Sequence, residues 1–149
     1  MPTPPKRPKY DPRIEQRYGA LVDSLVAQMG HAPDSLYVNP ALSANYGDRG
    51  ETRGNVVTVA SPNDPQALFH ELGHFWSSNE QNASRQLGDS TKFDPYSHKG
   101  GERLADTFAA LLRSNNDTTN ATKDVKLLAR ILARQRDKQN EQGNIPNNR

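Results

Sequence analysis

The run of residues 65–76, PQALFHELGHFW, constrains the fold of this chain more than any other segment. It starts at a proline and contains no helix breaker, and Asp64 before it is suited to cap a helix. We therefore predict a helix that ends near Ser77. His70 and His74 are four residues apart, so they lie one turn apart on one face of this helix.

Residues 70–74 read HELGH and match the pattern HExxH. Two imidazoles one turn apart can bind a single Zn²⁺ ion. Glu71 follows the first histidine and points to the flank of the same face. From there its carboxylate can take a proton from a water and later pass it to a leaving amine. The pattern therefore predicts a catalytic zinc site with Glu71 as its general base.

A catalytic zinc site usually has a third protein ligand, and the best candidate is Glu102, at the start of a predicted helix. Asp106 lies one turn further along the same face, where it can accept the spare ring N–H of a ligand histidine. Because sequence separation does not give distance, three further side chains remain open as metal ligands: Glu80, Asp94 and His98.

Small residues occur where the two predicted ligand helices would meet. Ala105 lies between Glu102 and Asp106 in the sequence, and Gly73 lies within the HExxH pattern. We expect these two residues to let the helices pack closely.

The order of these elements resembles that of the gluzincin metallopeptidases, with a strand, the HExxH helix, a loop, and a helix carrying E-x-x-x-D. The run ERLADTFAALL at 102–112 is similar to the third-ligand helix of the ImmA/IrrE-like minimal metallopeptidases. The approach to HELGH through residues 57–59 and 67–69 is similar too. The resemblance covers residues 12–114. It implies a zinc endopeptidase with Glu71 as catalytic base and three zinc ligands, His70, His74 and Glu102.

Apolar periodicity and capping residues predict the other elements. In chain order these are a helix over 12–29, β-like runs at 35–38 and 55–60, an edge strand or hairpin within 39–54, a polar loop at 79–99, and helices over about 101–114 and 123–135. The predicted fold is α+β, a minimal zincin-like domain. A small mixed sheet of about three strands packs on the N-terminal helix, the HExxH helix and the third-ligand helix, and a further helix follows.

The domain organisation follows from an uneven composition. Only 33% of the residues are hydrophobic, and both ends of the chain are polar. We predict a disordered, basic, proline-rich arm over residues 1–11, a single metallopeptidase domain over 12–134, and a disordered polar tail over 135–149.

Tetrahedral intermediates of peptide hydrolysis need a donor that stabilises the oxyanion. Tyr96 and His98 lie just before Glu102 and are the nearest candidates in sequence; Tyr46 and His31 are others. We also expect an edge strand within residues 43–60 to receive an extended peptide substrate by β-addition.

Composition excludes several classes of function. The chain has no cysteine, so disulfides, thiolate zinc sites and cysteine nucleophiles are impossible. No apolar stretch is typical of a membrane span or a signal peptide, so we expect a cytoplasmic protein that does not engage membranes.

The net charge is +2, and much of this positive charge lies in the basic arm. We therefore expect a protein or peptide substrate rather than nucleic acid, and the sequence leaves the oligomeric state open.

The leading hypothesis is a zinc metallopeptidase, a hydrolase with Zn²⁺ as its cofactor. One alternative is a zinc-binding interaction module without proteolytic activity. The intact Glu71 argues against it, because zinc binding does not require this carboxylate. The other alternative is a nucleic-acid-associated protein, which only the basic arm supports.

Overall fold

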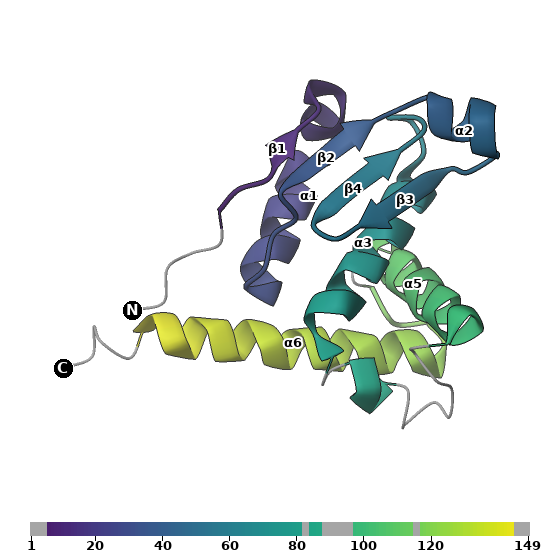
Figure 1. Ribbon diagram of the computed structural model, residues 1–149. Coiled ribbons are helices and arrows are strands. Elements are labelled where there is room, and N and C mark those ends of the chain that lie inside the picture. Colours follow the sequence, from purple (N-terminus) through teal and green to yellow (C-terminus); the bar gives the residue numbers. More distant parts are fainter. Residues whose placement is uncertain (1–5, 82–83, 88–96, 115–116, 145–149) are drawn as a thin grey trace.

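The computed structural model describes residues 6–81, 84–87, 97–114 and 117–144, with the backbone alone at residues 45–46 and 139–144. A small sheet lies over a layer of helices, and a long C-terminal helix crosses beneath them (Figure 1). The strands are β1 (Lys9–Tyr10), β2 (Ser35–Val38), β3 (Gly50–Arg53) and β4 (Val56–Val59). The helices are α1 (Pro12–Met29), α2 (Ala41–Tyr46), α3 (Pro65–Asn79), α5 (His98–Arg113) and α6 (Lys123–Asn144).

The sheet has the strand order β1-β2-β4-β3, so β1 and β3 are its edges. Strand β2 runs parallel to both β1 and β4, whereas β3 is antiparallel to β4. The turn between β3 and β4 contains Gly54, whose φ of 55° lies in the left-handed region that favours glycine. The α+β class is confirmed, and the mixed sheet has four strands where we expected about three.

Helices α1, α3 and α5 begin at residues that cap them through their side chains. Asp11 accepts a hydrogen bond from the Arg13 backbone N–H at the start of α1, and Asp64 accepts one from the Ala67 N–H at the start of α3. Ser97 caps α5 in the same way. Each cap satisfies a backbone donor that has no partner within its own helix, and this fixes where the helix begins.

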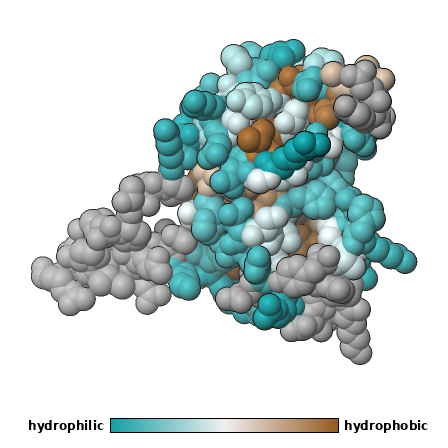
Figure 2. Space-filling view, viewed as in Figure 1, coloured by the Kyte–Doolittle hydropathy of each residue, from teal (hydrophilic) through white to brown (hydrophobic). Residues whose placement is uncertain are grey.

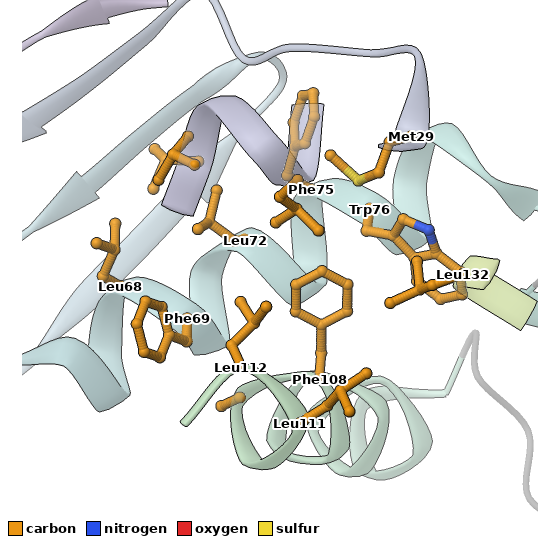
Figure 3. Packing of buried hydrophobic residues seen from close by; sticks show 14 of the residues in the cluster. Met29, Leu68, Phe69, Leu72, Phe75, Trp76, Phe108, Leu111, Leu112 and Leu132 are labelled. Carbon is orange, nitrogen blue, oxygen red and sulfur yellow. The ribbon is translucent and has the colours of Figure 1, made fainter. Parts of the chain in front are cut away.

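Helix α3 lies at the centre of the core. Its buried side chains Leu68, Leu72, Phe75 and Trp76 lie between α1, the sheet and α5 (Figure 3). From α5, Phe108 packs against Trp76 with ring centroids 5.8 Å apart. Because most side chains of α3 are apolar, they are buried in the core, and the face that carries the histidines is the one that reaches solvent.

Two described elements extend into the ends of the chain that we predicted to be disordered. Lys9 and Tyr10 form β1, and α6 continues to Asn144, although we predicted a disordered arm through residue 11 and a disordered tail from residue 135. Arg7 is also held in place, because its guanidinium pairs with Glu15 and Asp23 of α1. Ion pairs hold Arg7 and backbone pairing holds Lys9 and Tyr10, although no apolar periodicity indicates this in the sequence.

On the face shown in Figure 2, hydrophobic residues occur in small groups among hydrophilic ones. Among the described residues, Tyr37 is the one large hydrophobic residue that is exposed to solvent. Within the described part of the chain, no helix combines the length and the apolar character that a membrane crossing requires.

Candidate metal centre

Helix α3 brings His70 and His74 together on its exposed face. Their Nε2 atoms lie 3.2 Å apart, and the ring planes are nearly perpendicular, with centroids 4.8 Å apart. Spacing of four residues along a helix accounts for this arrangement. Both rings keep part of their surface accessible, with 17% and 28% of the side chains exposed.

Glu102, in the second turn of α5, reaches both imidazoles. Its Oε2 lies 2.8 Å from Nε2 of His70, and its Oε1 lies 3.2 Å from Nε2 of His74. The three side chains offer ligand atoms that all lie within 4.8 Å of one another. Two imidazole nitrogens and one carboxylate are the donor set of a His₂Glu zinc site, which leaves a position open for water or substrate. The predicted group of His70, His74 and Glu102 is thus assembled in a form that could hold a metal ion.

Asp106 contacts the other side of the first histidine. Its Oδ1 lies 2.8 Å from Nδ1 of His70, and Asp106 is one turn along α5 from Glu102. If Nδ1–H donates this hydrogen bond, the Nε2 lone pair of His70 is left facing Glu102 and His74. A carboxylate in this position orients the ring and fixes the tautomer that a metal requires.

Glu71 is largely buried beside the cluster, with 7% of its surface exposed. Its Oε1 accepts a hydrogen bond of 2.7 Å from the Thr52 hydroxyl, on strand β3. Burial raises the pKa of Glu71 above its ordinary value, and the Thr52 hydrogen bond and the two nearby imidazoles oppose that rise. A carboxylate with a raised pKa, held near a candidate metal site, is suited to accept and release a proton.

The distance between α3 and α5 is set by two small residues, as the sequence predicted. A Cβ added to Gly73 would lie 2.9 Å from the Cα of Ala105 and 2.9 Å from the Cβ of Phe108. Ala105 itself is fully buried. Close packing of these helices is what allows Glu102 to reach both histidines.

Two pockets adjoin the cluster, one on each side. The first has a volume of about 340 Å³ and is lined by residues 47–50, by Gln66 and Ala67, and by His70, Glu71, Glu102 and Asp106. The second, of about 350 Å³, is lined by His74 and Glu102 together with His98 and small polar residues. Since Glu102 lines both pockets, the cluster lies between two open cavities.

The other candidate ligands and oxyanion donors lie outside the metal-binding group or outside the described residues. His98 is exposed and lines the second pocket, but it does not join the metal-binding group. Glu80 pairs with His31, with 3.0 Å between Oε1 and Nε2, and neither belongs to that group. Tyr96 and Asp94 lie outside the described residues, as does the side chain of Tyr46.

Sequence reasoning missed Thr52 and Gly50, which both contact Glu71. They lie 19 and 21 positions before it, in a polar stretch with three glycines where no periodicity fixed a strand register. Only the pairing of β3 with β4 brings them beneath the HExxH helix.

The chain matches no protein-family model, no curated protein and no solved structure. The class of the site is therefore defined by its own geometry. It is a His-His-Glu group that could hold a metal ion, with a buried glutamate next to it.

Proposed function

We propose that the protein is a zinc-dependent metallopeptidase that hydrolyses peptide bonds with Glu71 as general base. The observation that carries the proposal is the group of His70, His74 and Glu102, whose ligand atoms lie within 4.8 Å of one another. The Glu71 carboxylate lines the same pocket as two of these three residues. Binding a metal requires only His70, His74 and Glu102, whereas hydrolysis also requires Glu71 as a base.

When bound, zinc would act as a Lewis acid that lowers the pKa of water and polarises a substrate carbonyl. The residues of the chain perform the other tasks. Glu71 takes the proton of the attacking water and returns it to the leaving amine. Asp106 holds the Nδ1–H of His70, so that the Nε2 lone pair of that ring stays directed at the site.

The proposed substrate is a protein or peptide in extended conformation. Strand β3 is an edge of the sheet and borders the first pocket through Gly50, so a peptide could extend the sheet there by β-addition. The pockets on both sides of Glu102 would take the residues that flank the cleaved bond. His98, in the second pocket, is a candidate for a donor to the oxyanion.

The other two hypotheses receive less support. A zinc-binding module without activity has no use for a buried carboxylate held beside its metal ligands, because burying such a group costs free energy. For nucleic-acid binding, the basic arm was the only support. One of its cations, Arg7, is already paired with Glu15 and Asp23.

The test of the proposal is metal-dependent hydrolysis. Purified protein would be analysed for bound metal and then incubated with a broad peptide library, with and without a chelator. We expect one zinc per chain, cleavage that the chelator abolishes, and recovery on adding zinc. Protein without a metal site would exclude the proposal, and zinc-loaded protein that cleaves no peptide would favour the interaction module.

A further inference from the structure

Strand β3 presents two residues to the HExxH helix. In the register of the β3–β4 pair, Thr52 lies opposite Val57 and Gly50 lies opposite Val59. Both valines are buried on the inner face of the sheet. Because side chains alternate between the two faces of a strand, Thr52 and position 50 also face inward, toward α3.

Both of these positions touch Glu71. The Thr52 hydroxyl lies 2.7 Å from Oε1 of the carboxylate and 3.0 Å from the Glu71 carbonyl oxygen. The hydroxyl has one proton, and the charged carboxylate is both the nearer and the stronger acceptor. At position 50, an added Cβ would lie only 2.7 Å from Cγ of Glu71, so glycine leaves the space that this side chain occupies.

The backbone groups of the same two residues point to the free edge of the sheet. The Ala60 N–H donates to the Arg49 carbonyl across the hairpin at 2.9 Å. In an antiparallel pair the backbone groups of successive residues point alternately toward and away from the partner strand. It follows that Gly50 and Thr52 direct their N–H and C=O groups away from β4.

We propose that Thr52 is a positioning residue for Glu71 and that it holds the carboxylate in register with a peptide bound along β3. The inference rests on the proposed peptidase function. Glu71 follows a metal ligand, and two imidazoles and Glu102 lie close to it. Without a fixed donor, its flexible side chain would turn toward a bound cation. The Thr52 hydrogen bond holds the carboxylate against the strand, where a paired peptide would present its backbone.

The first test compares three substitutions in zinc-loaded protein. Thr52→Val keeps the β-branched shape but removes the donor, and Thr52→Ser restores the donor. Thr58→Val is the matched control, because Thr58 is the neighbour of Val57 on β4 and faces the opposite side of the sheet. We expect Thr52→Val to lower kcat by about 10-fold to 100-fold with little change in KM, since small misplacements of a catalytic group have effects of this size. Thr52→Ser and Thr58→Val should stay near the wild-type rate.

A double substitution separates positioning from a purely structural role. If Thr52 acts through Glu71, adding Thr52→Val to Glu71→Gln should not lower the residual rate further. Equal fractional losses in the two backgrounds would overturn the proposal, as would a wild-type kcat for Thr52→Val. If Thr52→Val does not fold, Thr52→Ala takes its place in the same comparison.

A third readout does not depend on activity. In crystal structures of zinc-loaded protein, we expect Glu71 Oε1 to stay within hydrogen-bond distance of the hydroxyl at position 52 in wild type and in Thr52→Ser. In Thr52→Val the carboxylate should leave that position, and finding it unmoved would overturn the proposal. If wild type cleaves no peptide, the proposed function fails, but this readout still decides whether Thr52 positions Glu71.

Discussion

Gly73 of α3 lies so close to Ala105 of α5 that a single Cβ on the glycine would come within 2.9 Å of the Ala105 Cα. The neighbour is backbone of a packed helix, and it cannot move aside as a flexible side chain can. The same contact sets how far Glu102 must reach to meet His70 and His74. The packing of two small residues is therefore coupled to the geometry of the candidate metal centre.

We predict that Gly73→Ala destabilises the protein by about 1–3 kcal/mol, the usual range for overpacking a core. It should also weaken zinc binding, because the two ligand helices are pushed apart. Gly19→Ala is the control, since its Cβ would meet the flexible side chains of Glu15 and Arg7, and alanine favours the helical state. Urea unfolding and zinc titration of both variants measure these effects. Unchanged stability of Gly73→Ala would refute the packing argument.

Zinc binding should depend on both histidines of α3. We predict that His70→Ala and His74→Ala each abolish tight binding, whereas His98→Ala retains it, because His98 lies outside the metal-binding group. Zinc would link α3 to α5, so chelation should also lower the melting temperature. Elemental analysis and thermal unfolding provide the two readouts. Stoichiometric zinc in both α3 variants would exclude this site.

The third ligand and its neighbour should differ in the size of their effects. We predict that Glu102→Ala weakens zinc binding severely, because it removes the carboxylate that faces both Nε2 atoms. Asp106→Asn should weaken it by about 10-fold to 100-fold, the range for a residue that orients a ligand. Competition with a chromogenic chelator measures both affinities. If Glu102→Ala binds zinc as wild type does while Asp94→Ala does not, Glu102 is not the ligand.

Asp64 should make stability depend on acid pH. The Arg49 guanidinium, which bonds both carboxylate oxygens, holds the pKa of Asp64 below its ordinary value of 3.8, and the Ala67 N–H adds to this. A lowered pKa stabilises the folded state above the unfolded pKa, and that contribution is lost as the pH falls through the folded pKa.

Asp64→Asn keeps a side chain that can cap α3 but removes the charge. We predict that it lowers the free energy of unfolding by up to about 1 kcal/mol at pH 7, and that the difference from wild type shrinks progressively as the pH falls below about 4. Urea unfolding of metal-free protein across this range tests the prediction. Asp48→Asn, at an exposed carboxylate that caps no helix, is the control. A difference that persists unchanged at pH 3 would be inconsistent with the ion pair as its cause.

Strong local signals made parts of the fold predictable from sequence. The start of α1 was predicted by Asp11 and Pro12, and the start of α3 by Asp64 and Pro65. The spacing of His70 and His74 predicted that both imidazoles lie on one face of α3. Glu102 could be selected because its helix carries an acid one turn further on. The structure brings all three into one group.

Other features had no local signal. Strand β1 has only two residues and is held by backbone pairing with β2, which leaves no periodic pattern. The last turns of α6 contain polar residues without an apolar face. They continue the helix because extending an existing helix needs no new nucleus and because Gln, Lys and Glu are good helix formers. The contact of Thr52 with Glu71 depends on strand register, which the polar stretch before β4 did not reveal.

The most direct test of the account is peptide hydrolysis by Glu71→Gln beside wild type, both loaded with zinc. Glutamine keeps the shape of the side chain and can still accept a hydrogen bond from Thr52, but it cannot act as a base. The account predicts that the variant folds, binds zinc as wild type does, and loses hydrolysis by at least about 100-fold, the low end for a general base. Hydrolysis at the wild-type rate by the zinc-loaded variant would contradict it.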